Sequence, residues 1–358
     1  MEKKKEEKRA PVRIGLIGCG KITERLALPQ LRGRSDVVVA ALVDRDRSIA
    51  QRLADQFEID QRLIWTDWTC MLKEADLEAV GVCVPNYLHA EITVAALNAK
   101  KHVLVEKPIA MTLAEADAMI EAARTNERYL MVDQTQRFDP VHEVAYEILR
   151  SDLLGRVTQL HGRIGHAGPE YWCGSETSWF LDTRQSGGGA LMDVGIHVLD
   201  LLRWLSGKQV RRVCCQGKTL QERTAPEDTA NALLEFTDGA LGSFEVSWAT
   251  RPYEVTTTFA ADRGKLQTSS GSVNAVTIQL GRCGVDSGAL LGACAPPVPA
   301  GSRYGGAYPY FIDCLLHKTP PCVSGEEGRA SLEVILAAYE SIRRNEWVEL
   351  PQKTVHSR

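Results

Sequence analysis

Hydrophobic residues in the first third of the chain form short runs that alternate with segments of helical spacing. Five runs rich in β-branched residues are predicted strands: Val12–Ile17, Val37–Val43, Ala79–Val84, His102–Glu106 and Tyr129–Val132. Apolar positions three and four residues apart predict amphipathic helices between them: Ile22–Arg32, Arg47–Phe57, His89–Ala99 and Leu113–Arg124. Apolar strands alternating with such helices are typical of a parallel sheet covered on both faces. The pattern therefore predicts a doubly wound α/β domain.

The hydrophobic pattern changes after Pro140. A helical segment, Val141–Arg150, comes before a strand at Val157–Ile164. A stretch over 166–189, rich in glycine and aromatic residues, then leads into a second helix, Ala190–Ser206. The regular alternation of strand and helix ends here, so a second domain is predicted to begin near this point.

Short strands without intervening helices dominate residues 209–267, which is typical of an antiparallel or mixed sheet. Two of them, Ala230–Phe236 and Ala240–Ala249, flank a hairpin turn. Residues 284–308, rich in Gly, Ala and Pro, are predicted to form a loop, and Gly328–Asn345 a helix that covers one face of the sheet. An α/β domain followed by an α+β domain is the predicted architecture.

Composition narrows the class of protein. The 358 residues are 44% hydrophobic and 25% charged, as in an average globular protein, and the net charge of −4 argues against a general nucleic-acid binder. No apolar run approaches the roughly 20 residues of a membrane span. The ten cysteines are scattered without a C-x-x-C pair, which predicts a reducing, cytoplasmic location and no zinc site. Met1–Arg9 is almost entirely Lys, Glu and Arg, so residues 1–10 are expected to form a disordered tail.

A glycine-rich turn of the kind that binds phosphate follows the first predicted strand. Gly18 permits a tight turn, and Gly20 lets the backbone approach a pyrophosphate lying against the free N–H groups of the next helix. Lys21 and Ile22 begin that helix and are therefore predicted cofactor contacts. Thr23 replaces the third small residue of the fingerprint, and we expect it to loosen the packing of helix on strand.

An acidic residue stands where a dinucleotide site needs one. Asp44 ends the second predicted strand, 24 positions after Gly20. Its carboxylate would accept hydrogen bonds from the adenosine ribose hydroxyls and repel a 2′-phosphate, which favours NAD as the cofactor. Arg45 beside it could pair with that phosphate, so NADP is the alternative.

Two later motifs carry side chains suited to proton transfer. Glu106-Lys107-Pro108 closes the fourth predicted strand, and Asp193 and His197 lie four residues apart on the predicted helix after three glycines. Oxidation of a secondary alcohol needs a base within reach of the hydroxyl, and His197, with an ordinary pKa near ~6.5, suits this role. A cationic Lys107 would stabilise the developing alkoxide, and Asp193 would orient the ring or bind a neighbouring hydroxyl.

Less specific interpretations of these residues stay open. A lysine is usually part of a solvated surface, although the restricted backbone before proline fixes the direction of Lys107. Asp193 and His197 could form a helix-stabilising contact or part of a metal site, and we predict catalysis instead. Asp200 is expected to make contacts within its domain.

Together with Val84-Pro85-Asn86-Tyr87-Leu88-His89, these motifs closely resemble the glucose–fructose oxidoreductase, inositol dehydrogenase and rhizopine-catabolism (Gfo/Idh/MocA) family. The resemblance runs from about Val12 to Asn345. It implies a Rossmann domain over 11–133 and a substrate-binding and oligomerisation domain over 134–352, built on a large, open, mainly antiparallel sheet. The exposed face of that sheet often forms the oligomer interface in the family, so a homodimer or homotetramer is expected.

The resemblance also assigns roles to residues. It implies that Lys107, Asp193 and His197 are the catalytic positions. It places four further residues near the cofactor: Pro85, Asn86, His89 and Glu106. Arg137-Phe138-Asp139-Pro140 matches the family's segment after the fifth strand, whereas Gln134-Thr135-Gln136 differs from the usual pattern. That difference puts the identity of the substrate in doubt more than the type of reaction.

The predicted function is hydride transfer between NAD(P) and a secondary alcohol or ketone of a sugar, inositol or sugar derivative. The substrate would contact Lys107, Asp193 and His197, and the aromatic residues Trp172 and Trp179, with Arg184, could line its pocket or simply pack in the core. One alternative is a reductase of an aromatic dihydrodiol or similar carbonyl compound. Another is a non-catalytic NAD-binding regulator, although such relatives tend to lose the lysine and histidine that this chain keeps.

Overall fold

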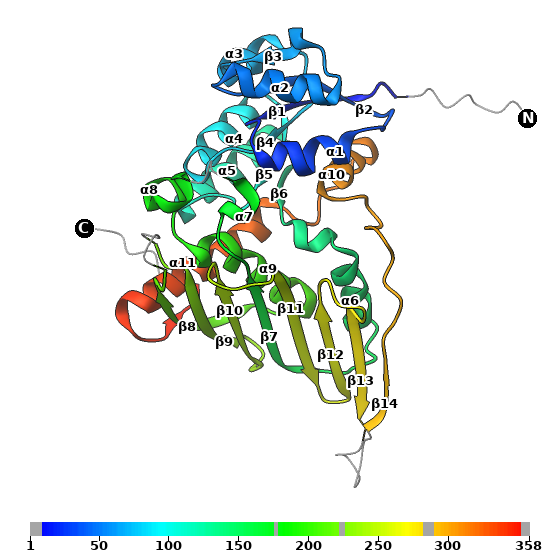
Figure 1. Cartoon of the computed structure of the whole chain (residues 1–358), viewed down its shortest axis with the longest axis vertical. Helices are drawn as coiled ribbons and strands as arrows, with labels where there is room; N and C mark the ends of the chain where they lie inside the picture. The colour runs from blue at the N-terminus through cyan, green and yellow to red at the C-terminus, as the bar shows by residue number, and fades with distance from the viewer. Residues whose placement is uncertain (1–8, 175–177, 222–225, 282–289, 352–358) are drawn as a thin grey trace, which may run out of the picture.

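Two β-sheets organise the chain in the computed structural model, which describes residues 9–174, 178–221, 226–281 and 290–351 (Figure 1). The first sheet has six parallel strands in the order β3-β2-β1-β4-β5-β6. Its strands are β1 (Val12–Ile17), β2 (Val37–Val43), β3 (Ile64–Trp65), β4 (Ala79–Val82), β5 (His102–Glu106) and β6 (Leu130–Asp133). The strand order reverses between β1 and β4, and ligands of such sheets bind outside the carboxyl ends of the strands at that point. This sheet confirms the predicted Rossmann fold.

The helices of this region begin and end as their sequences dictate. They are α1 (Leu28–Leu31), α2 (Arg47–Phe57), α3 (Trp68–Glu74), α4 (His89–Asn98) and α5 (Leu113–Asn126). A capping box begins α5, where Thr112 Oγ1 accepts from the Glu115 N–H at 3.2 Å and the Glu115 carboxylate accepts from the Thr112 N–H at 2.9 Å. The short strand β3 and helix α3 are absent from the predicted pattern because each is too short to show a clear period.

The second sheet has nine strands in the order β14-β13-β12-β11-β7-β10-β9-β8-β15, and only the β7–β10 pair is parallel. Its strands are β7 (Val157–Gly165), β8 (Val210–Lys218), β9 (Thr229–Phe236), β10 (Leu241–Ser247), β11 (Glu254–Ala261), β12 (Gly264–Ser269), β13 (Val276–Gly281), β14 (Leu290–Cys294) and β15 (Val348–Glu349). The prediction of a large, mainly antiparallel sheet is confirmed.

Helices cover one face of this sheet and leave the other open (Figure 1). They are α6 (Pro140–Arg150), α9 (Ile196–Ser206) and α11 (Gly325–Arg344), with α7 (Glu170–Cys173) and α8 (Thr183–Ser186) in the connection before α9. Gly162 on β7 lets α9 approach, because a Cβ atom there would lie 2.6 Å from Val198 Cγ1. No helix within the described ranges is long and apolar enough to cross a membrane.

Several elements differ from the predicted ones. The segment 284–308 is not a continuous loop, since β14 pairs with β13 and α10 (Ala307–His317) begins at its end. Helix α10 packs against α1 and β1 of the first sheet, although it follows β14 of the second sheet in the chain (Figure 1). Two predicted helices begin with π-helical turns, at Thr23–Ala27 and Leu191–Gly195. The predicted tail lies outside the described residues up to position 8.

Candidate active site

A cleft of about 1220 Å³ opens at the carboxyl ends of the first sheet and extends to β7 of the second sheet. Most of the predicted site residues line it: Gly18, Gly20, Lys21, Ile22, Asp44, Arg45, Pro85, Asn86, Glu106, Lys107, Trp179, Asp193 and His197. The fold thus brings together side chains that are up to 179 positions apart in the sequence.

The glycine turn fits a dinucleotide phosphate. Gly18 has a φ of +92°, and a Cβ atom there would lie 2.1 Å from the carbonyl oxygen of Cys83, so no other residue fits. Nothing lies within 4 Å of the Cβ position of Gly20, which leaves open space for a ligand beside the backbone. Thr23 does not loosen the packing as expected. Its side chain is fully buried, and Oγ1 donates to the carbonyl oxygen of Gly18 at 2.5 Å, which closes the turn.

Asp44 connects the end of β2 to this turn. One carboxylate oxygen accepts from the Cys19 N–H at 2.9 Å and the other from the Asp46 N–H at 3.0 Å. A carboxylate offers about four lone-pair sites, so acceptor capacity remains for ribose hydroxyls. Arg45 is exposed beside it, and Lys21 pairs with Glu24 at 2.9 Å. These residues fit the adenosine and pyrophosphate parts of NAD.

Two residues predicted to lie near the cofactor, His89 and Asn86, join segments of the protein. His89 is fully buried, with Nδ1 2.8 Å from the carbonyl oxygen of Pro108 and Nε2 2.9 Å from that of Val84. It lies behind the cleft wall and ties the loops after β4 and β5 together. Asn86 reaches the cleft, but its amide donates to the carbonyl oxygen of Ser186 at 2.7 Å and so links the first sheet to the helix before α9.

The predicted substrate residues divide between the cleft and the surface. Trp179 lines the cleft and stacks on Phe180 with ring centroids 3.8 Å apart. Arg184 does not line it, because its side chain is 87% exposed and pairs with Asp182. The side chain of Trp172 lies outside the described part of the structure. Tyr253, which the sequence did not single out, forms part of the wall.

The predicted catalytic residues converge on Asp193. Lys107 Nζ donates to Asp193 Oδ1 at 2.6 Å and to its backbone oxygen at 2.8 Å. The indole N–H of Trp248 donates to Asp193 Oδ2 at 3.0 Å. Burial has the largest single effect on the pKa of Asp193 and raises it, but the charge and hydrogen bond of Lys107, together with His166 and His197, outweigh burial, so this pKa lies below its usual value. Asp193 is therefore an ionised carboxylate fixed from both sides.

Two glycines before the π-helical turn allow the chain to place Asp193 in the cleft. Gly188 and Gly189 precede the π-helical turn, and Cβ atoms on them would lie 2.0 Å from Tyr339 Oη and 1.9 Å from the Glu227 carbonyl oxygen. Glu227 then accepts from the N–H groups of Gly189 and Leu191 at 3.1 and 2.9 Å. These two glycines therefore allow close packing within the protein and are not needed for a ligand.

His197 faces the same cleft and is held by Gln134. Its Nδ1 lies 3.0 Å from Gln134 Oε1, which can only accept, so Nδ1 carries the proton and Nε2 keeps its lone pair. Burial, reinforced by the charge of Lys107, lowers the pKa of His197 to about 3. The imidazole is therefore neutral at pH 7, and it is a weaker base than its ordinary pKa suggested.

Two residues near Asp193, His166 and Trp248, were not predicted from the sequence. His166 lies with Nε2 3.8 Å from Asp193 Oδ2, and Trp248 is only 1% exposed. Each stands alone at the end of a strand, where a buried aromatic ring usually belongs to the core. Only the pairing of β7 with β10, which brings the two strand ends together, could have revealed them.

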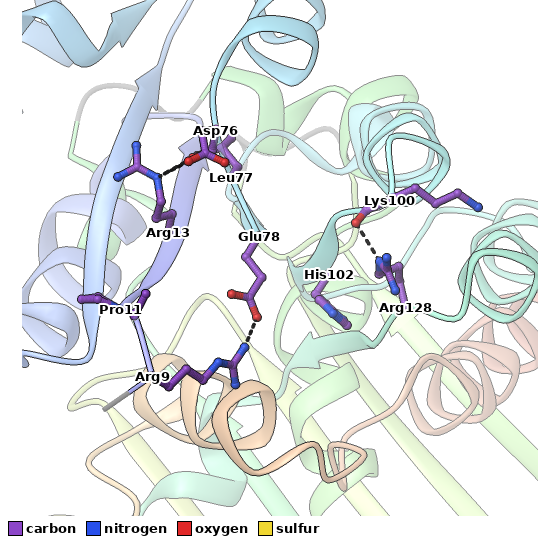
Figure 2. A pocket seen from close by; sticks show the side chains of 10 residues that line it. Arg9, Pro11, Arg13, Asp76, Leu77, Glu78, Lys100, His102 and Arg128 are labelled. Atoms are coloured by element: carbon purple, nitrogen blue, oxygen red, sulfur yellow. Dashed lines mark hydrogen bonds and ion pairs between the residues drawn. The ribbon is translucent and has the colours of Figure 1, made fainter. Parts of the chain in front are cut away.

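A second pocket of about 510 Å³ lies at the amino ends of the first sheet's strands (Figure 2). Its cations are already engaged: Arg9 pairs with Glu78, Arg13 donates to the Asp76 carbonyl oxygen at 2.8 Å, and Arg128 to that of Lys100 at 2.7 Å. Helices α3, α4 and α5 end here, and cations stabilise such negative helix ends. The cations that line this pocket therefore have a structural role at the ends of these helices.

Within the described residues, no three His, Cys, Asp or Glu side chains are grouped so that they could hold a metal ion.

The two family models that match this chain belong to the same family. Residues 12–134 match the model of the oxidoreductase family with an NAD-binding Rossmann fold (GFO_IDH_MocA), and residues 142–267 match the GFO/IDH/MocA C-terminal domain. Myo-inositol 2-dehydrogenase of Thermotoga maritima is 26% identical over 352 residues, with 95% of this chain and 99% of that protein covered. D-glucoside 3-dehydrogenase of Escherichia coli is 26% identical over 360 residues, with 95% and 98% covered.

A solved structure extends the comparison to ligands. The WlbA dehydrogenase from Bordetella pertussis, in complex with NADH and UDP-GlcNAcA, superposes with a TM-score of 0.77 at 25% identity. The match covers 96% of this chain and 100% of that one.

Proposed function

The chain belongs to the Gfo/Idh/MocA family of oxidoreductases, and from this premise we propose that it is an NAD-dependent dehydrogenase of a sugar, inositol or sugar derivative. The observation that carries the proposal is the convergence of Lys107, Asp193 and His197 in the cleft that also contains the glycine turn and Asp44. A nucleotide site and a proton-transfer site share one opening, as hydride transfer requires.

Lys107, Asp193 and His197 have different roles at the reacting oxygen of the substrate. When bound, the nicotinamide accepts or supplies the hydride. An ammonium group has three donors, and Lys107 uses two on Asp193, so the third is available to the substrate oxygen. There it stabilises negative charge as alkoxide character develops. Asp193 keeps the amine in position.

His197 is proposed as the group that accepts the hydroxyl proton. Its Nε2 keeps a lone pair because Gln134 holds the proton on Nδ1. A pKa of about 3 makes the imidazole a weak base toward an isolated alcohol. We therefore infer that the proton moves as the hydride leaves, when the hydroxyl becomes strongly acidic.

A less polar substrate is the second candidate. The aromatic wall of Trp179, Phe180 and Tyr253 favours a substrate with a flat or apolar face, and an aromatic dihydrodiol or similar carbonyl compound would offer one. A purely regulatory role would not require the contacts of Lys107 and His197.

We also propose that the chain works in the cytoplasm as a homodimer or homotetramer through the open face of the nine-stranded sheet. In support, Leu233 and Leu241 on neighbouring strands are each more than half exposed on that face. The proposed units are a dinucleotide-binding domain over 11–133 and a substrate and oligomerisation domain over 134–352. Arg45 keeps NADP open as a second cofactor.

A substrate panel tests the main proposal. Inositols, aldoses, nucleotide-linked sugars and an aromatic dihydrodiol would be incubated with NAD and with NADP, and reduced nicotinamide followed by absorbance. We expect turnover with a polyol or sugar, and a kcat about 10²–10³-fold lower in Lys107→Met with the same substrate. Tight NAD binding with no turnover of any panel member would contradict the proposed function and favour the regulator.

A further inference from the structure

Two acidic residues stand side by side at the carboxyl ends of the first sheet. Glu106 ends β5 and Asp133 ends β6, and the two are direct partners in the parallel register. Side chains paired in this way leave the sheet on the same face, about 5 Å apart. The strands β4, β5 and β6 form the half of the sheet opposite Asp44, where the nicotinamide half of a dinucleotide would lie. Glu106 lines the cleft, and Asp133 is only 1% exposed.

The two carboxyl groups are close enough to interact and have too few donors to be ionised together. The strand register places them side by side, and Glu106 Oε1 and Asp133 Oδ1 are buried without a donor among the described groups. Two adjacent negative charges in a buried site are strongly unfavourable, so the pair keeps at least one proton.

Among the described residues, the groups around the pair do not supply a free positive charge. Lys107 is next to Glu106 in the sequence, but its amine forms an ion pair with Asp193. Cys83 at the end of β4 and Tyr308 on α10 contact each other at 3.0 Å. Burial raises the pKa of both, so thiol and phenol stay uncharged near pH 7.

Of the described titratable groups in this half of the cleft, the pair is therefore the one that can change charge near neutral pH. Burial raises the pKa of Asp133 to about 7, and burial together with Asp133 raises that of Glu106 well above its usual value. His166 and His197 are already neutral there, because burial lowers the pKa of each. The pair thus alternates between a neutral form with two protons and a singly charged form with one.

We propose that the Glu106–Asp133 pair makes the chain select the oxidised over the reduced dinucleotide in a pH-dependent way. The nicotinamide ring carries a positive charge in NAD⁺ and none in NADH. A singly charged pair near this ring attracts the oxidised form only, so NAD⁺ binding drives one proton from the pair into the solvent. The proposal rests on dinucleotide binding alone and is independent of the sugar chemistry proposed above.

The test measures binding of NAD⁺ and NADH to the unmodified chain by calorimetry between pH 6 and 8. The ratio of the NADH Kd to the NAD⁺ Kd is expected to rise about three- to tenfold across this range, because a linked proton changes affinity by at most tenfold per pH unit. Repeating NAD⁺ binding in buffers of different ionisation enthalpy counts the released proton. We expect release with NAD⁺ and little with NADH.

Variants assign the effect to the pair. In Glu106→Gln/Asp133→Asn both titrating groups are gone, so the ratio should become independent of pH and no proton should be released. Tyr308→Phe is the matched control, because it removes a neighbouring hydroxyl and keeps both carboxyl groups, and it should retain the pH dependence. A flat ratio in the unmodified chain, or an undiminished slope in the double variant, would overturn the proposal.

An infrared measurement covers the case in which the double variant does not fold. The infrared spectrum of the ligand-free unmodified chain, after subtraction of the spectrum of Asp133→Asn, should show the carbonyl stretch of a protonated carboxylic acid at pH 6. The intensity of this band should fall toward pH 8. The absence of such a band at both values would equally overturn the proposal.

Discussion

Lys107→Met tests the central contact of the site. Methionine keeps the length and apolar stem of lysine but removes the three donors, so Asp193 loses its contacts at 2.6 and 2.8 Å. We predict that kcat falls by about 10²–10³, the usual effect of removing a donor to a developing oxyanion. NAD affinity should change little, because the glycine turn and Asp44 are untouched.

The same variant should lose stability in a way that depends on pH. Removing one partner of a buried ion pair costs about 3–5 kcal/mol, and we expect the lower end because the Lys107 and Asp193 side chains are 17% and 12% exposed. The folded pKa of Asp193 lies below its unfolded value in the unmodified chain, so the pair stabilises above that unfolded pKa and is lost as the pH falls through the folded one. Without Lys107 the raising effect of burial dominates. The loss of stability should therefore be larger at pH 7 than near pH 4.

A double variant separates the two effects. In Lys107→Met/Asp193→Asn no buried charge is left alone, and the amide can still accept from Trp248. Urea unfolding at pH 7 should show the double variant about 1–2 kcal/mol more stable than Lys107→Met, with turnover equally low. Additive destabilisation in the double variant, or kcat near the original value in Lys107→Met, would refute the reasoning.

Four further outcomes are expected. Asp44→Ala should weaken NAD more than NADP and loosen the glycine turn, which a comparison of the two Kd values would show. His197→Gln should lower kcat about 10²–10⁴-fold at every pH from 6 to 9, because the imidazole is neutral throughout; a loss confined to one end of the range contradicts its role. Gln134→Leu should lower kcat about five- to tenfold with KM nearly unchanged, by freeing the ring tautomer, and an unchanged kcat argues against this positioning. Burial lowers the pKa of five histidines: His89, His102, His142, His166 and His197. The free energy of unfolding should therefore fall as the pH drops below about 6.5, by up to ~1.4 kcal/mol per pH unit for each of them, because the unfolded chain binds protons that the folded chain does not. Urea midpoints that do not change with pH would contradict this.

The first domain could be predicted from the sequence because its signals are local. Buried parallel strands form continuous apolar runs, and the glycines and Asp44 occur at fixed distances along the chain. The second domain was harder, since an antiparallel sheet with one open face gives weaker alternation. Strand β14 and helix α10 were missed because Gly, Ala and Pro near them suggest a loop, whereas pairing with β13 and packing on α1 decide their structure.

The candidate site shows a similar limit. Lys107, Asp193 and His197 could be found because each lies in a recognisable motif. Trp248 and His166 could not, since their relation to Asp193 arises from strand pairing and has no spacing along the chain. Arg184 and His89 fit a plausible pattern, but the first is paired at the surface and the second lies behind the cleft wall.

Two neighbouring residues at the end of β6 reach the two sides of the cleft. Asp133 ends β6 and Gln134 follows it, so their side chains point in opposite directions. Asp133 reaches Glu106 on the cofactor side, and Gln134 reaches His197 on the substrate side. Two adjacent positions thus set the charge beside one reactant and the tautomer beside the other. A change at either one should alter only its own partner: Gln134→Leu should leave the preference for NAD⁺ over NADH unchanged, and a shift in that preference would show that the two sides are coupled.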